Sequence, residues 1–193
     1  MTRPLRWGIA VVSLTVVGAR AATPSALDQR DWRQYRTSFI TAEGRVLDTG
    51  NQGISHSEGQ GYAMLLAEAY GDAIQFDRLW RWTRTHLQVR DDHLFAWRWE
   101  PSDAGGAVAD TNSASDGDIL IALALARAAQ RWDVPSYEKA AAAIASDVLE
   151  RLVRPVEAWS VLLPGAKGFV HDAVVTVNPS YWVFPALQEL DRV

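Results

Sequence analysis

The chain has 193 residues, of which 48% are apolar and 22% charged, a balance that favours one folded domain over a disordered chain. It has no cysteine, which excludes disulfides and thiolate metal sites, and its four histidines show no metal-binding spacing, so no metal or cofactor is expected. The net charge is −4, and the nine tryptophans are either packing residues, the favoured explanation, or platforms for sugar rings.

Residues 1–21 have the pattern of a signal peptide. Arg3 and Arg6 precede an apolar run, and the small residues Ala19 and Ala21 form a cleavage site. The run is short for a permanent membrane anchor, which is the alternative interpretation. We therefore expect the segment to be removed, no stable anchor to remain, and the protein to be secreted or periplasmic.

The predicted mature domain, residues 22–193, is acidic. Without the three arginines of the signal peptide, 16 of the 19 basic residues remain against 23 acidic ones, a net charge of −7. Nucleic-acid binding depends on neutralising phosphates with Lys and Arg, so no nucleic-acid partner is expected. A neutral polysaccharide fits this charge better.

The domain is predicted to be all-α. Apolar periodicity and breakers predict helices over residues 27–40, 57–70, 73–87, 115–132, 136–153 and 181–190. Residues 41–56 are predicted to be a loop and 88–113 to be irregular or partly extended, because glycines or prolines interrupt them, and 173–177 to be extended. Pro185 is expected to limit or kink the last helix.

The sequence SEGQGY at residues 57–62 opens the second helix. Its two glycines each cost about 1 kcal/mol relative to alanine, which makes sense if another helix or a ligand approaches the backbone closely. Glu58 falls in the first turn, where the helix dipole stabilises an acid. The residues leave open whether Glu58 is a capping acid or a catalytic one.

Two acids, Asp116 and Asp118, begin the fourth helix, and one of them can serve as its cap. Being two positions apart, they point to different sides of the helix and cannot share one role. A calcium site is a weaker alternative because the EF-hand spacing is missing.

Residues 95–99 alternate aromatic and other side chains, so their aromatic rings would face the same side of an extended strand. Trp97 and Trp99 are candidate sugar platforms, or they cover the edge of the core. Glycosidic cleavage needs one protonated carboxyl and a second that activates water or attacks the sugar. The residues alone therefore indicate an acid-lined cleft with aromatic side chains.

These motifs resemble glycoside hydrolase family 8, which includes bacterial endoglucanases and the cellulase associated with cellulose synthesis. The run ASDGDILIALALARAAQRW at residues 114–132 looks like the family signature, and residues 57–64 are similar to the stretch that carries the general acid. LFAWRW at 94–99 and NPSY at 178–181 look like further landmarks in the expected order.

The resemblance implies that Glu58 is the general acid. Asp116 matches the signature acid, described either as a nucleophile or as a substrate-binding residue; because the family is inverting, the second role is favoured. The further candidate substrate-binding residues are Trp97, Trp99, Asn112, Asp118 and Tyr181. The expected substrate is β-1,4-glucan, cellulose foremost, with mixed-linkage glucan, xylan and chitosan open, and the cellulose-synthesis machinery is a candidate partner.

The family fold is an (α/α)6 toroid, which needs a longer chain. We therefore expect a C-terminally truncated protein with the N-terminal half of the barrel and an incomplete catalytic domain over residues 22–193. The general base belongs to a later Asp-Ala segment, and Asp172 precedes the NPSY landmark, so that role is not assigned to it. Exposed apolar helix faces and little hydrolysis are expected; the alternative is a non-catalytic glycan-binding remnant using Trp97, Trp99 and Tyr181.

Overall fold

The computed structural model describes residues 28–103, 105–172 and 174–191, so the predicted signal peptide lies outside the described residues. The all-α prediction is confirmed: the main elements are the helices α1 (Gln29–Phe39), α2 (Ser57–Ala69), α3 (Ala73–His86), α4 (Ser115–Trp132), α5 (Pro135–Asp147) and α6 (Phe184–Leu190). The described strands form three short antiparallel pairs, namely β1 (Ser55–His56) with β2 (Arg98–Trp99), β3 (Val153–Val156) with β4 (Trp159–Leu162), and β5 (Val170–His171) with β6 (Val174–Val175).

The last two predicted helices differ from those observed. The helix expected over 136–153 ends at Asp147, followed by a π-helical turn (Val148–Leu152) and then strand β3. The helix expected over 181–190 begins only at Phe184, after a 3-10 turn, η2 (Pro179–Tyr181). Pro185 lies in the first turn of α6, where its missing N–H leaves no hydrogen bond unmade, so it starts the helix and does not kink it.

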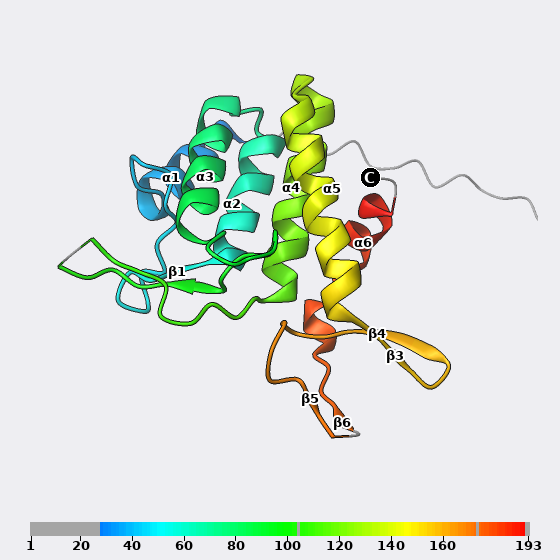
Figure 1. Cartoon of the computed structure of the whole chain (residues 1–193). Coiled ribbons are helices and arrows are strands. Elements are labelled where there is room, and N and C mark those ends of the chain that lie inside the picture. The colour runs from blue at the N-terminus through cyan, green and yellow to red at the C-terminus, as the bar shows by residue number, and fades with distance from the viewer. Residues whose placement is uncertain (1–27, 104, 173, 192–193) are drawn as a thin grey trace, which may run out of the picture.

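Helix α4 is the centre of the core and is buried along most of its length. It lies between α2 and α5, and both α2 and α4 begin at the lower end of the helical layer in Figure 1, above the β5–β6 hairpin. Two glycines allow this close packing. A Cβ added to Gly61 would lie 2.7 Å from Cβ of Leu120, and one added to Gly117 would lie 2.2 Å from Oγ of Ser57. The packing therefore brings the first turns of the two helices together, as the early glycine at position 61 predicts.

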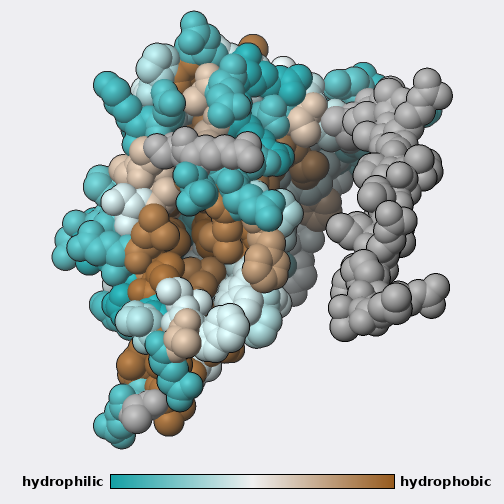
Figure 2. All heavy atoms as spheres, turned by 90° about the vertical axis from the view of Figure 1, so that its right-hand side faces the viewer, coloured by the Kyte–Doolittle hydropathy of each residue, from teal (hydrophilic) through white to brown (hydrophobic). Residues whose placement is uncertain are grey.

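One face of the molecule, turned toward the viewer in Figure 2, exposes apolar side chains. A shallow apolar groove between α5 and α6 is lined by Ile119, Ala145, Val148, Leu149, Leu187 and Leu190. Leu149 is 67% exposed, and Phe184 is 62% exposed. The expectation of exposed apolar helix faces is confirmed here. Within the described ranges, no helix has the length and apolarity to cross a bilayer.

Candidate active site

A cavity of about 340 Å3 lies at the first turns of α2 and α4. It contains four of the predicted site residues, Glu58, Trp97, Asp116 and Tyr181, and its other lining residues are Asp48, His56, Ser57 and Ala114. Because these residues come from separate parts of the chain, the fold alone assembles the site. The cavity has the size of a small-molecule or sugar-binding subsite.

Glu58 reaches the cavity from the first turn of α2 and is exposed. The backbone around it is fixed, because the N–H of Ser57 donates to the carbonyl of Trp97 at 3.1 Å and β1 pairs with β2. Among the described residues, no hydrogen bond engages the Glu58 carboxylate. The capping interpretation therefore has no support in the geometry, and the carboxyl is available to a ligand.

Asp116 lines the same cavity as Glu58, from the first turn of α4, and is only 7% exposed. Its Oδ1 accepts a hydrogen bond from the N–H of Gly117 at 2.9 Å. Burial raises the pKa of Asp116, and the nearby Glu58 carboxylate raises it further, against the opposing effect of the Gly117 N–H. Burial likewise raises the pKa of Tyr181, with smaller contributions from Asp116 and Glu58. The charge of Glu58 therefore affects the pKa of both Asp116 and Tyr181, and the charge of Asp116 affects the pKa of Tyr181.

Trp97 forms an aromatic wall of the cavity and is half-buried. Its Nε1 donates to Oδ2 of Asp110 at 2.9 Å, and the Arg98 guanidinium lies 4.7 Å from its ring centroid. The His56 ring stacks beside it, with centroids 5.9 Å apart. The indole is thus held in place on several sides, as a stacking platform requires.

The structure corrects the interpretation of Trp99 as a sugar platform. Its ring is buried against Trp82, with centroids 5.6 Å apart, and under the guanidinium of Arg45 at 4.7 Å. A Cβ on Gly106 would lie 2.2 Å from the ring, so the loop that carries Gly106 closes over it. Trp99 covers the core edge, which was the other interpretation.

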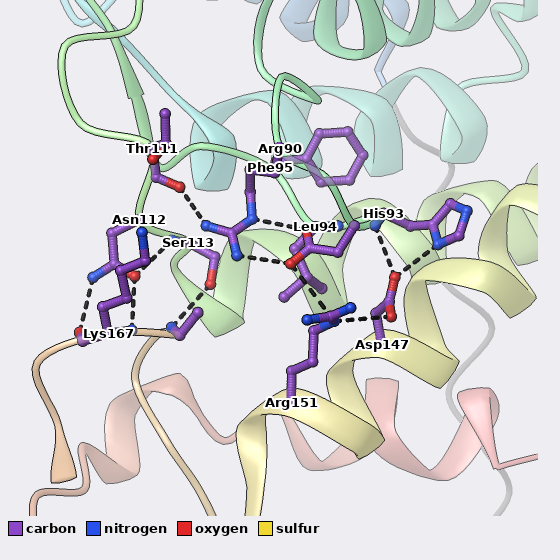
Figure 3. Close-up of polar contacts among 12 residues, drawn as sticks. Arg90, His93, Leu94, Phe95, Thr111, Asn112, Ser113, Asp147, Arg151 and Lys167 are labelled. Atoms are coloured by element: carbon purple, nitrogen blue, oxygen red, sulfur yellow. Dashed lines mark hydrogen bonds and ion pairs between the residues drawn. The ribbon is translucent and has the colours of Figure 1, made fainter.

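Asp118 and Asn112 hold loops and do not line the cavity. Asp118 is fully buried, and its Oδ1 accepts from the N–H of Phe95 at 2.8 Å; burial raises its pKa well above the usual range. Asn112 pairs with the backbone of Lys167, donating to its carbonyl and accepting from its N–H, both at 2.9 Å (Figure 3). Neither side chain is placed to contact a ligand in this cavity.

Sequence reasoning missed Asp48 and His56. Oδ1 of Asp48 accepts from the N–H of Gly50 at 3.1 Å, and its Oδ2 lies 3.4 Å from Nε2 of His56. His56 could have been found from its position directly before the SEGQGY run. Asp48 could not, because only the fold of its glycine-rich loop brings it to the cavity.

Comparison with known proteins gives a consistent result. The family model for glycosyl hydrolases family 8 matches residues 2–192. An endoglucanase of Cellulomonas uda is 43% identical over 183 residues, which are 95% of this chain and 50% of that protein. A probable endoglucanase of Novacetimonas hansenii is 46% identical, over 93% of this chain and 52% of that protein.

Among solved structures, an endoglucanase from Klebsiella pneumoniae, described as a family 8 glycosyl hydrolase, superposes with a TM-score of 0.81 at 42% identity. The match covers 84% of this chain and 52% of that one. The chain therefore spans about half the length of the relatives it matches.

Proposed function

The chain belongs to the glycosyl hydrolases of family 8, and we propose that its cavity at the first turns of α2 and α4 binds β-1,4-glucan for endo-acting hydrolysis. The observation that carries this proposal is the convergence of Glu58, Asp116, Trp97 and Tyr181 on one cavity. Two carboxyls beside an aromatic wall are the groups that protonating and holding a pyranose ring require.

In the proposed reaction, Glu58 donates its proton to the glycosidic oxygen of the leaving sugar. Its side chain is exposed to the cavity and free of internal hydrogen bonds among the described residues, so it can reach that oxygen. Asp116 accepts hydrogen bonds from hydroxyls of the sugar on the other side of the bond. Because Asp116 is buried and fixed by Gly117, it suits holding the sugar in a distorted shape.

An inverting reaction also needs a base that holds water, with its carboxyl roughly 6.5–9.5 Å from the acid. Asp48 is the third carboxylate of the cavity, but Gly50 and His56 already engage its two oxygens. We therefore assign no base to the described residues and propose that residues 22–193 alone bind glucan and hydrolyse it slowly. We also propose that the protein is exported to the periplasm or the medium, on the basis of its N-terminal pattern. The resemblance to the cellulase associated with cellulose synthesis supports the cellulose-synthesis machinery as a partner.

The test compares the chain with Glu58→Gln. Cellotetraose binding is measured by calorimetry, and hydrolysis of carboxymethyl cellulose by the release of reducing ends. We expect binding to be retained in both proteins, and whatever hydrolysis the parent shows to disappear in E58Q. Unchanged hydrolysis in E58Q would refute Glu58 as the acid, and a parent that fails to bind cellotetraose would refute glucan binding.

A non-catalytic glycan-binding role is the second candidate, favoured by the same aromatic wall at Trp97. It predicts equal binding by both proteins with no hydrolysis in either. A hydrolysis rate in the parent that E58Q abolishes excludes it.

A further inference from the structure

A second and larger cavity, of about 540 Å3, lies beside the loop that leads into α4. Thr111 of this loop lines the second cavity, whereas Ala114 lines the candidate active site. The two cavities share no lining residue. The second one is lined by four basic side chains, Arg90, Arg151, Arg154 and Lys167, and two acidic ones, Asp91 and Asp92, beside Val89, Thr111 and Ala166. A basic cavity is unexpected in a chain with a net charge of −4.

Buried carboxylates hold two of the guanidiniums of this cavity, those of Arg90 and Arg151, and Figure 3 labels both arginines. The Asp92 side chain is 1% exposed and accepts from Nε and Nη2 of Arg90 at 2.8 and 2.7 Å. Nη1 of Arg90 donates to the carbonyl of Thr111. Asp147 accepts from Nε of Arg151 at 3.2 Å and from the N–H of His93 at 2.7 Å. Internal partners therefore engage each of the three guanidinium nitrogens of Arg90 but only Nε of Arg151.

Several donors of the basic side chains that line this cavity are not used in internal contacts. Among the described residues, no hydrogen bond or ion pair uses Nη1 or Nη2 of Arg151, Nε or Nη2 of Arg154, or Nζ of Lys167. Lys167 contributes only its backbone to the contact with Asn112, so its ammonium group is not needed to hold the loop. A pre-oriented arginine beside two further cations is an arrangement that binds an oxyanion through charge-assisted hydrogen bonds.

The acidic and polar part of the lining narrows the ligand class. Asp91 is exposed and would repel a bare anion, but it can accept hydrogen bonds from hydroxyl groups. Thr111 adds a hydroxyl that can donate or accept. The volume is within the range of cavities that hold ligands much larger than a phosphate ion. A ligand with one oxyanion and several hydroxyls can form hydrogen bonds with the basic side chains through the oxyanion, and with Asp91 and Thr111 through the hydroxyls.

We propose that this second cavity is a binding site for an anionic sugar, a uronic-acid unit of an acidic polysaccharide, whose carboxylate contacts Arg151, Arg154 and Lys167. Its hydroxyls contact Asp91 and Thr111. The site is separate from the candidate active site, so it does not depend on glucan hydrolysis by Glu58. It gives the protein a point of contact with a charged glycan, in addition to the candidate active site for neutral glucan.

The chain offers a matched internal control, because Lys139 and Lys167 are its only lysines. Lys139 is exposed on α5 and lines neither cavity. Reductive 13C-methylation keeps the positive charge of both side chains, and NMR then follows each of them separately, with K139R and K167R to assign the signals. The probes are a tetrasaccharide of β-1,4-linked glucuronic acid, cellotetraose and inorganic phosphate.

We expect the glucuronate tetrasaccharide to shift the Lys167 signal saturably and leave Lys139 unmoved, with cellotetraose causing no Lys167 shift. Calorimetry should show about tenfold weaker tetrasaccharide binding for K167Q, and unchanged binding for K139Q, because one charge-assisted hydrogen bond is lost. Three results overturn the proposal: no shift of Lys167, equal shifts of both lysines, or phosphate binding as tightly as the tetrasaccharide. The last result would reduce the cavity to a site for simple oxyanions.

Discussion

Replacing Gly117 by alanine should separate the first turns of α2 and α4 and so weaken both the fold and glucan binding. A Cβ at this position would lie 2.2 Å from Oγ of Ser57 and 2.9 Å from Cβ of Ser57 and from the backbone nitrogen of Glu58. Rotation of the Ser57 hydroxyl can relieve only the first contact. The other two involve atoms that the helix fixes, so α2 itself has to move, and Glu58 moves with it.

The magnitude follows from two opposing effects. Overpacking a buried contact costs about 1–3 kcal/mol, and the higher helix propensity of alanine returns up to about 1 kcal/mol. Because two of the three contacts involve atoms that the helix fixes, we place the cost at about 2–3 kcal/mol and expect G117A to lower the free energy of unfolding by about 1–2 kcal/mol. Gly59 is the control, because a Cβ there meets only Cγ1 of Val46 at 3.7 Å, an ordinary contact. G59A should stabilise the protein by up to about 1 kcal/mol.

Urea unfolding followed by far-UV circular dichroism measures both variants, and calorimetry with cellotetraose measures binding at a temperature where each is folded. G117A should have a lower unfolding midpoint with an unchanged slope, and weaker binding. If G117A unfolds at the same urea concentration as G59A, the close approach of the two helices does not constrain the fold, and the reasoning is wrong.

Three further predictions concern Trp97, which lines the cavity, and Trp99 and Asp118, which are buried in the core. Trp97→Ala should weaken cellotetraose binding about 5–30-fold, because a sugar platform is lost, with little change in the urea midpoint; unchanged affinity would argue against stacking. Trp99→Ala should instead lower the free energy of unfolding by about 3–5 kcal/mol, since its ring is buried, and a loss below 1 kcal/mol would contradict this. Asp118→Asn tests the raised pKa of Asp118. The native state keeps this proton after the unfolded state has released it, so stability falls as the pH rises from about 4 through the folded pKa. The stability of D118N relative to the parent should therefore increase between about pH 4 and pH 8, and a constant difference would refute the assignment.

Most helices could be predicted from the sequence because their signals are local. The prediction of 115–132 matches α4 from end to end, since Ser115 and two acids mark its first turn, an apolar run follows from Ile119, and the helix stops at Asp133, which adopts a left-handed conformation. The helix over 136–153 was predicted six residues too long, because residues 148–153 contain no glycine or proline that would signal its end, and five of them form a π-helical turn. The observed ending depends on the pairing of β3 with β4, which local propensity does not encode.

The site residues that could be predicted are those that lie within recognisable sequence motifs. Glu58, Asp116, Trp97 and Tyr181 were all named from the sequence, and the structure brings them to one cavity. The prediction that Trp97 and Trp99 share a face required an extended strand over residues 95–99, but only Arg98–Trp99 is a strand. Trp97 precedes it in irregular backbone, so the two rings face different surroundings.

Asp116 and Asp118 lie in one helix turn but have different roles, because only Asp116 lines the cavity. Their positions place Asp116 at the cavity and Asp118 in the core, where it accepts from the N–H of Phe95. Phe95 lies two residues before Trp97, so the buried acid anchors the loop that carries the aromatic wall. A single helix turn thus supplies a carboxyl that lines the cavity and an anchor for the loop that carries Trp97. Loss of Asp116 should then weaken glucan binding directly, whereas loss of Asp118 should act through the position of Trp97.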